Sequence, residues 1–462
     1  MKRKINTNKS LWIILLVGTI LVSCKLTENY KRPDGIVDKA LFRDVNAADT
    51  ASIGNIPWKQ MFKDSLLQKL IQEGIDNNLD LKIAMSRIKE SEANLRQSKA
   101  AFFPTLSINA NGPIANTSNI PANSSLFQLY GNASWEVDIL GKYRSSKKAT
   151  LAVFLQSEAY KKAVQTQLVS DIASNYIALL ALDAQLQITL KTLDNRALDV
   201  EIMKKLKESD VVTGAAVVQS EANRYSVEVT IPDLRQNIRV TENALSILLG
   251  RKPGPIERDS LNNQQTWTGL QTGVPLQLLA NRPDVMEAEY QVRYNFELTK
   301  VARTYFYPSL TITANGGWAN KNIADIFNPV SIFGSILSGI VQPVFNHGLN
   351  KQRLDIAKAQ EEEALASFKK TLLNAGQEVS NALYNYQTAS DKIKIREKQI
   401  DFLQKSVDYT KELLKYSANT NYTDVLTSEQ SLLAAQLNNV NDKVQQLQAV
   451  IALYRSLGGG WK

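Results

Sequence analysis

Histidine and cysteine, the side chains that most often bind metals or act as catalysts, each occur once in this 462-residue chain. One histidine and one cysteine cannot supply the three or four ligands that hold zinc, and a lone cysteine cannot form an internal disulfide. His347 lies in a Phe-Asn-His-Gly stretch between a predicted strand and a predicted helix, where a turn residue is a simpler interpretation than a catalyst. The sequence has no glycine-rich phosphate loop and no Gly-x-Ser-x-Gly motif, and the acidic run Glu361–Glu363 is typical of a solvated helix face. We therefore predict that the protein is not an enzyme and holds no cofactor or metal.

The single cysteine, Cys24, points to lipid attachment. Met1–Lys4 is positively charged, and Leu11–Val22 is an apolar run of twelve residues, too short to span a bilayer and typical of a signal peptide. The run ends in Leu21-Val22-Ser23-Cys24, which resembles the bacterial lipobox. We predict a signal peptide over residues 1–23 and a lipid-modified Cys24. The alternative is an incidental cysteine in a signal peptide that is cleaved elsewhere.

Composition is that of a folded protein, with 44% hydrophobic and 21% charged residues. The net charge of +9 is spread along helical segments in which acidic and amide residues alternate with the basic ones, and no compact basic cluster is interleaved with aromatic residues. We therefore expect no nucleic-acid binding. Beyond the signal peptide, no stretch approaches twenty apolar residues, so any membrane-embedded part has to be a closed β-sheet.

The chain repeats itself after 207 residues. Apolar residues recur at seven-residue steps in both copies, and Gly141 in the first corresponds to Gly348 in the second. A period this long indicates a duplicated structural unit, and the strict heptad spacing indicates helices that wrap around neighbours. The two ladders are Ile172, Leu179, Leu186, Leu193 and Val200, then Val379, Tyr386, Ile393, Ile400, Val407 and Leu414.

Strand patterns precede each ladder. Residues 127–139 alternate between apolar or small and polar side chains over thirteen positions, which predicts a strand. Shorter alternations at Leu106, Ile108 and Ala110 and at Leu310, Ile312 and Ala314 predict two more. A fourth strand is expected within 331–345, although its alternation is poor.

The helical runs 141–209 and 348–417 follow the strands. Each has some 65 residues and a length of about 100 Å, and each is followed by a return helix of about 35 residues. The domains we predict are a signal peptide (1–23), a lipidated N-terminal linker (24–57), a first repeat (58–255), a linker (256–275) and a second repeat (276–462).

Each repeat thus supplies two strands and a long helical hairpin. Four strands cannot enclose a lumen, and open sheet edges are not tolerated in lipid, so the chain has to oligomerise. Three chains would give twelve strands, enough for a channel. The predicted fold class is an α+β membrane protein, in which a trimeric twelve-stranded β-barrel with four strands per chain continues into a long periplasmic α-helical barrel.

Several short motifs, in this order along the duplicated chain, resemble those of the TolC/OprM type of outer-membrane efflux factor, in its lipoprotein branch. They are Tyr30-Lys31-Arg32-Pro33, the segment Trp135–Lys142, Ala244–Gly250, Asn281–Val285, Tyr307–Thr311 and Tyr454–Trp461. The resemblance implies a homotrimer in the bacterial outer membrane, in contact with its lipid, lipid-anchored and extending into the periplasm. It also implies a periplasmic adaptor and an inner-membrane pump of the RND type as partners. Such a duct passively conducts small toxic compounds and drugs, and it is gated at the periplasmic helix tips.

The resemblance places the gate and the adaptor contact at the hairpin tips. The candidate residues are Asp210, Gly214, Tyr422, Asp424, Thr427 and Gln430. Thr427 and Gln430 stand where related proteins often carry an acidic residue and an arginine, so an aspartate ring at those positions is not expected. Asp424, one turn nearer the tip, forms either a threefold acidic ring or an ordinary solvated carboxylate at a helix start.

Two other functions stay open. A periplasmic coiled-coil scaffold or adaptor lipoprotein, anchored by Cys24 alone, would explain the heptads and the lipobox. It would not explain two pairs of alternating strands placed alike before each hairpin. The same duct could instead serve protein secretion, because the pump and not the duct selects the cargo.

Overall fold

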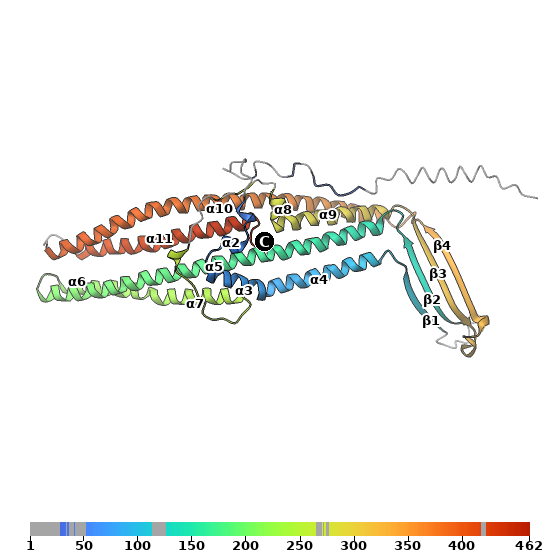
Figure 1. Ribbon diagram of the computed structural model, residues 1–462, viewed down its shortest axis with the longest axis horizontal. Helices are drawn as coiled ribbons and strands as arrows, with labels where there is room; N and C mark the ends of the chain where they lie inside the picture. Colours follow the sequence, from blue (N-terminus) through green and yellow to red (C-terminus); the bar gives the residue numbers. More distant parts are fainter. Residues whose placement is uncertain are drawn as a thin grey trace, which may run out of the picture. The chain divides into compact units, whose positions relative to one another are not determined.

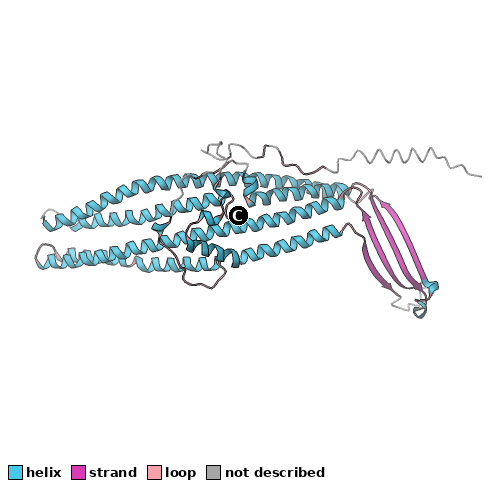
Figure 2. Ribbon diagram, viewed as in Figure 1, coloured by secondary structure: helices cyan, strands magenta, loops and turns pink. Residues whose placement is uncertain are grey.

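The computed structural model describes residues 28–33, 35–36, 41, 52–112, 126–264, 270, 272–273, 277–416 and 422–462, so the predicted signal peptide and Cys24 lie outside it. The chain divides into two compact units, which Figures 1 and 2 show as helices and one sheet. The first unit consists of Met1–Ile36, Arg87–Ser157 and Glu287–Lys369, and the second of Val37–Ser86, Glu158–Met286 and Lys370–Lys462.

The first unit contains the sheet, and all four predicted strands are present. They are β1 (Thr105–Asn111), β2 (Phe127–Val137), β3 (Ser309–Asn320) and β4 (Ile332–Val341), antiparallel in the order β1-β2-β3-β4. Strand β2 ends two residues earlier than the alternation predicts. The reason is Asp138, whose carboxylate accepts hydrogen bonds from the backbone N–H groups of Tyr143 and Arg144 and so caps the helix that follows.

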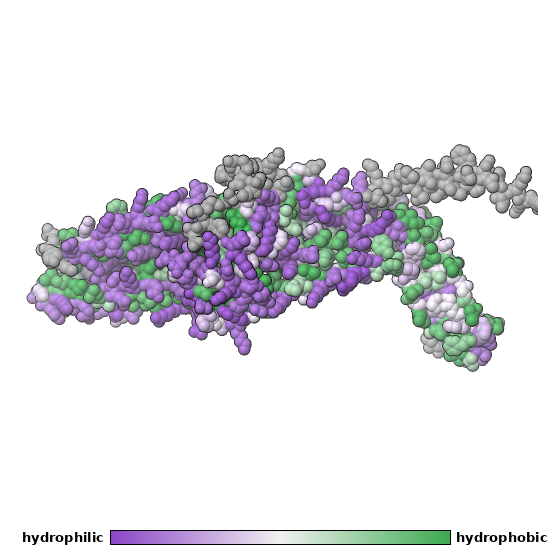
Figure 3. Space-filling view, in the orientation of Figure 1, coloured by the Kyte–Doolittle hydropathy of each residue, from purple (hydrophilic) through white to green (hydrophobic). Residues whose placement is uncertain are grey.

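Strand register separates an apolar from a polar face of the sheet. Leu129 pairs with Trp318 and Trp135 with Ile312 on one face, while Asn132 donates a hydrogen bond to Asn315 on the other. Figure 3 shows the hydrophobic side chains that gather over the sheet. The alternation seen in the sequence therefore gives a sheet with one apolar and one polar face.

One glycine has a packing role in the sheet. Gly317 pairs with Tyr130 on one side and Phe333 on the other, and these two rings contact each other with centroids 6.0 Å apart. A Cβ at Gly317 would lie 2.4 Å from the Cα of Tyr130. The missing side chain therefore lets two aromatic rings meet across the middle strand.

The N-terminal segment of the first unit packs on α9 (Pro283–Thr304). Arg32 donates hydrogen bonds of 3.1 and 2.6 Å to the buried Glu289 carboxylate, and the Tyr30 ring meets Phe296 edge to face. Burial, followed by the Glu289 charge, raises the pKa of Tyr30 to about 12. The Tyr-Lys-Arg-Pro motif thus fixes the linker to a helix of the second repeat.

The long helices form as predicted. They are α5 (Lys142–Glu208) and α10 (Leu349–Tyr416), each of which starts in the first unit and ends in the second. None of the described helices combines the length and the apolar character needed to cross a membrane. The remaining helices are η1 (Ile53–Asn55), α2 (Trp58–Met61), α3 (Ser65–Asn77), α4 (Leu79–Ala100), α6 (Gly214–Glu228), α7 (Thr230–Leu248), η2 (Leu261–Asn263), α8 (Leu278–Asn281), η4 (Ile323–Asp325), η5 (Pro329–Ser331) and α11 (Tyr422–Ser456).

The two return helices differ, against the prediction of two alike. In the second copy α11 is continuous, whereas in the first copy the helix breaks at Val229 into α6 and α7. Pro232 explains the break, because it has no N–H to bond the carbonyl four residues earlier and its ring clashes with that carbonyl. The residue 207 positions later is Asn439, which fits a helix.

The first helical stretch of the chain is divided into short helices. It consists of α2, α3 and α4, because two polar side chains start new helices. Asp64 accepts from the N–H groups of Leu66 and Leu67 at the start of α3, and Asn78 accepts from Leu81 N–H at the start of α4.

In the second unit, part of each heptad ladder lies in the core. Ile172, Leu179 and Val379 are fully buried, and Val200 and Val407 nearly so. Near the middle of the helices, the glycine-rich C-terminal motif packs on the turn around Asn281. There Gly458 has φ +83, and a Cβ on it would lie 2.3 Å from the Asn281 carbonyl oxygen.

We expect Gly458→Ala to destabilise the second unit by about 2–4 kcal/mol, since alanine would combine a left-handed backbone conformation with overpacking. The measurement is the temperature at which the SDS-resistant oligomer dissociates. Gly254→Ala is the matched control, because its new Cβ would meet nothing closer than 3.9 Å. Equal dissociation temperatures for the two variants would contradict the packing argument.

Candidate functional site

The predicted tip residues of the first hairpin lie in the connection between α5 and α6. Asp210 is exposed and has φ +55, so it takes the left-handed position in the turn. Gly214 is the first residue of α6, and its φ is not positive. The turn therefore depends on an aspartate that tolerates the left-handed region, while Gly214 serves as a helix start.

At the second tip, residues 417–421 lie outside the described part of the chain. Tyr422, the first residue of α11, is buried, and its hydroxyl donates a 2.9 Å hydrogen bond to the equally buried Ser220 hydroxyl on α6. Burial is the main reason that the pKa of Tyr422 is raised. Tyr422 thus joins the two hairpins close to their tips.

The other three candidates occupy the exposed surface of α11. Asp424 is exposed in the first helical turn, and the Thr427 hydroxyl donates to the Thr423 carbonyl oxygen at 2.8 Å. Gln430 is exposed and borders a cavity between the hairpins. These three are therefore surface residues of α11, in contrast to the buried Tyr422.

Four charged residues that were not predicted form a cluster next to Tyr422. The Arg196 guanidinium of α5 bonds the Glu429 carboxylate of α11. Lys411 of α10 lies 2.5 Å from Glu429 Oε1 and 3.1 Å from the Asp199 carboxylate on α5. Arg196 is 2% exposed, Asp199 5% and Glu429 9%. A buried guanidinium and two buried carboxylates thus meet the partly exposed Lys411 between the two hairpins.

This cluster, which we call the hairpin charge cluster (Arg196, Asp199, Lys411 and Glu429), is balanced in charge but costly to disturb. Burial raises the pKa of Glu429, and the hydrogen bond from Lys411 opposes that rise. Removing one partner of a buried ion pair typically costs about 3–5 kcal/mol, whereas replacing a pair by well-packed apolar residues is often neutral. The cluster therefore fixes one particular pairing of the hairpins.

A signal for the cluster is visible in the sequence. Arg196 stands between the ladder residues Leu193 and Val200, and Lys411 stands between Val407 and Leu414. Both have helical spacing from the core residues, where a charged side chain is unexpected. Charged residues at core-facing positions of a heptad ladder thus indicate a buried ion-pair cluster.

Apolar side chains are also exposed along the outer helices of the second unit. On α10, Ile395, Phe402 and Tyr409 follow each other at heptad spacing and are 64–69% exposed. Figure 3 shows hydrophobic side chains over the α6 end of the hairpins as well. Exposed heptad stripes need a partner helix. On α6 and α7 the exposed residues are Val218, Tyr225, Val229, Val240 and Ile247.

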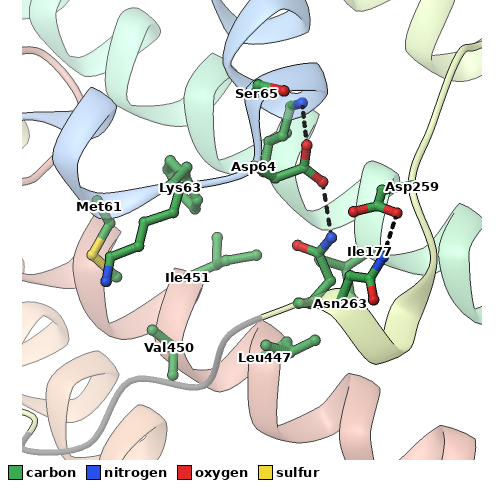
Figure 4. A pocket seen from close by; sticks show the side chains of 13 residues that line it. Met61, Lys63, Asp64, Ser65, Ile177, Asp259, Asn263, Leu447, Val450 and Ile451 are labelled. Carbon is green, nitrogen blue, oxygen red and sulfur yellow. Dashed lines mark hydrogen bonds between the residues drawn. The ribbon is translucent and has the colours of Figure 1, made fainter.

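A cavity of about 440 Å³ lies between α2–α3, α5, the loop after Pro255 and α11 (Figure 4). Its carboxylate Asp64 accepts from the Tyr176 hydroxyl at 2.7 Å and from Gln264 at 2.8 Å, besides capping α3. Burial favours a higher pKa for Asp64, but these hydrogen bonds outweigh it and lower the pKa. The polar groups here attach the loop to the helices, and they do not form an acid/base pair.

Sequence comparison relates the chain to outer-membrane proteins. A family model described as outer membrane efflux protein matches residues 70–251 and 274–459. The cation efflux system protein CusC of Escherichia coli strain K12 is 29% identical over 460 residues, covering 96% of this chain and 98% of CusC. The toluene efflux pump outer membrane protein TtgC of Pseudomonas putida is 28% identical, covering 98% and 96%. The probable outer membrane lipoprotein SilC of Salmonella typhimurium is 27% identical, covering 97% and 98%.

Structural comparison gives the same relatives. A crystal structure of CusC matches with a TM-score of 0.85 at 27% identity, covering 95% of this chain and all of that one. The open state of the Neisseria gonorrhoeae MtrE channel matches with a TM-score of 0.83 at 23% identity, covering 95% and 99%, and shares the fold. These matches confirm the predicted fold class, a trimer with a twelve-stranded β-barrel and a helical barrel.

Proposed function

The chain belongs to the outer membrane efflux protein family and is an efflux channel of the outer membrane, and from this premise we propose that the hairpin charge cluster holds the periplasmic end of its duct closed. The observation that carries the proposal is the cluster itself. It joins α5, α10 and α11 of both hairpins through buried ion pairs, close to the Tyr422–Ser220 contact. Any widening between the hairpins has to separate these charges.

Channels of this family are trimers that work with an adaptor and an inner-membrane pump. For this chain we propose a homotrimer that docks onto a periplasmic adaptor and a pump of the RND type. The exposed heptad stripe on α10 and the one on α6 and α7 support lateral packing of helices from neighbouring copies. The duct conducts passively, and the pump supplies the energy.

The proposed cargo is a set of small toxic compounds. Relatives are named for cation efflux and for toluene efflux, so the family architecture serves chemically different cargoes. The proposed lipid anchor at Cys24 is supported by the lipobox and by the name of SilC, a probable outer membrane lipoprotein.

Deletion of the gene should raise the intracellular accumulation of several compounds in a panel of dyes, antibiotics, solvents and metal cations. Complementation with the intact gene serves as the control and should restore export. Unchanged accumulation of the whole panel, together with a loss of a secreted protein, would favour the secretion duct over the efflux duct.

We expect Glu429→Ala to open the channel, because it leaves the buried Arg196 without its carboxylate partner and removes one of the two carboxylates that Lys411 contacts. A buried partner is worth about 3–5 kcal/mol, but Lys411 is 35% exposed and partly screened by water. An increase in open probability of about tenfold or more is therefore expected in planar-bilayer recordings.

Two further variants test the cause of that opening. Glu221→Ala removes a carboxylate from an exposed pair with Lys204 in the same part of the hairpins and should leave conductance unchanged. The double variant Arg196→Met with Glu429→Leu replaces the ion pair by apolar contact and should stay closed. An open double variant would mean that packing, and not charge pairing, closes the duct.

Mildly acidic pH should favour the closed state. In the closed state the groups that face Glu429 are Arg196 and Asp199 from α5, Lys411 from α10 and Tyr422 from α11. Its pKa there lies above its ordinary value because of burial, whereas a solvated Glu429 in the open state would have the ordinary value. Between those two values the closed state binds more protons, so it gains stability as the pH falls and loses it as the pH rises. Open probability should fall as the pH is lowered toward 4.5, the ordinary value for a glutamate, and Glu429→Gln should remove this dependence.

We also propose that Asp424 forms a threefold acidic ring at the aperture, which would favour cations. Its exposed position in the first turn of α11 supports the proposal. Asp424→Asn should then lower the cation selectivity of single channels, while Asp401→Asn, on the exposed surface of α10 and away from the tip, should not. Unchanged selectivity in the first variant would leave the ordinary helix-start carboxylate as the explanation.

A further inference from the structure

Strand β4 departs from the pattern that the other three strands follow on the polar face of the sheet. On that face the side chains of β1–β3 are polar or small, apart from the ring of Tyr130. The register of β4 places Phe333, Leu337 and Val341 on the same face, with Leu337 directly opposite Thr313. We call these three residues of β4 the apolar row. The polar face thus ends in one apolar strand at the edge of the sheet (Figure 1).

The apolar row faces the lumen of the barrel. An outer-membrane barrel turns its apolar face to the lipid and its polar face inward, and the fold class of this chain is such a barrel. Lipid contact is made by the opposite face of β4, where Ile332, Ile336 and Ile340 are 62–79% exposed. Contact with the membrane therefore does not explain why the apolar row is apolar.

Barrel closure leaves the apolar row uncovered. In the described part of the chain, Leu337 is 64% and Val341 61% exposed. Strands β4 and β1 are the two edges of the sheet, so in a closed trimer β4 pairs with β1 of the next copy. That pairing lies in the plane of the sheet and does not cover its faces. Side chains fill the interior of an eight-stranded barrel, whereas twelve strands leave a lumen, so the rows of three copies do not meet.

The apolar row extends along most of β4. Its members are four residues apart, so at about 3.4 Å per residue the row is about 27 Å long. The apolar band of such barrels is about 25 Å tall. At Phe333 the row continues sideways into Tyr130, because the centroids of the two rings are 6.0 Å apart. Three copies therefore give three apolar rows that follow the wall of the lumen.

The strands beside the apolar row have no unpaired charge. The four described strands contain a single charged residue, Glu136. Its carboxylate accepts hydrogen bonds from Lys142 Nζ at 2.9 and 3.0 Å and from the Tyr143 hydroxyl at 3.1 Å. The described strands therefore act on a passing molecule through apolar and uncharged polar contacts.

We propose that the apolar row is a track for uncharged organic cargo with an aromatic or aliphatic body. The body of the cargo contacts Phe333, Leu337 and Val341 in turn, because an apolar surface in water attracts apolar solutes. Polar groups of the cargo bond to neighbouring side chains such as Thr313. A hydrated inorganic ion gains nothing from such a wall. The track rests on the proposed efflux function and names the class of cargo that the barrel favours.

The test records single channels of the purified trimer in planar bilayers, with uncharged glucosides added on the extracellular side. 2-Naphthyl β-D-glucoside carries an aromatic body, and methyl β-D-glucoside carries the same sugar without one. During openings of the wild type, the naphthyl compound should halve the current at a concentration at least about tenfold lower than the methyl compound does. The double variant Leu337→Thr with Val341→Thr makes the row polar and keeps β-branched strand formers. It should raise the half-blocking concentration of the naphthyl compound by about threefold or more.

Leu337→Val is the matched control, because valine and threonine have the same shape and differ in a methyl group and a hydroxyl. Its naphthyl block should stay close to that of the wild type, and both variants should keep the SDS-resistant trimer. Val341→Thr alone, a smaller change, should act in the same direction as the double variant.

Equal block of the wild type by the two glucosides would overturn the proposal, and so would equal naphthyl block of the double variant and Leu337→Val. The recordings need neither the pump nor a known cargo. A row-dependent block without any change in accumulation on gene deletion would therefore contradict efflux alone, and efflux without the block would contradict the track alone.

Discussion

A helix of 67 residues is about 100 Å long, and its apolar stripe needs cover along that whole length. This requirement organises the second unit. Ile172 and Leu179 on α5 and Val379 on α10 are fully buried. The apolar residues that remain exposed on α10 and on α6–α7 are again heptad-spaced. They need cover by further helices, as the buried ladders do within the chain. Assembly with further copies follows from the packing requirement that shapes the single chain.

Much of the architecture could be predicted from the sequence because periodicity carries it. The alternation over residues 127–139 and at Leu310, Ile312 and Ala314, and the heptads of the 207-residue repeat, arise because one side of each element contacts solvent and the other is buried. The structure has strands and helices there. The break at Val229 was missed, although Pro232 is plainly visible. A pattern of apolar positions contains no information on the loss of one backbone N–H.

The candidate site was harder to predict than the fold. Tyr422 is buried and joins the hairpins, whereas Asp424, Thr427 and Gln430 lie on the surface of α11. The aperture or adaptor contact predicted for these residues stays a prediction. The hairpin charge cluster is hard to recognise from the sequence because its members lie far apart, at 196, 199, 411 and 429. Arg196 and Lys411 stand at core-facing positions of the ladders, but the sequence does not show which residues pair with them. Only the packing of three helices brings them out of water. Whether a charged side chain is buried depends on the tertiary packing around it.

The break in the first return helix also changes the symmetry of the assembled ring. If both repeats folded alike, three chains would present six equivalent hairpins, with grooves that a partner could not tell apart. Pro232 affects one repeat and Asn439 keeps the other straight, so the grooves alternate between two kinds. A single imino acid per chain thus reduces a pseudo-sixfold ring to true threefold symmetry. A protein that binds in these grooves would therefore bind in three copies if it recognises one kind of groove, and in six if it accepts both.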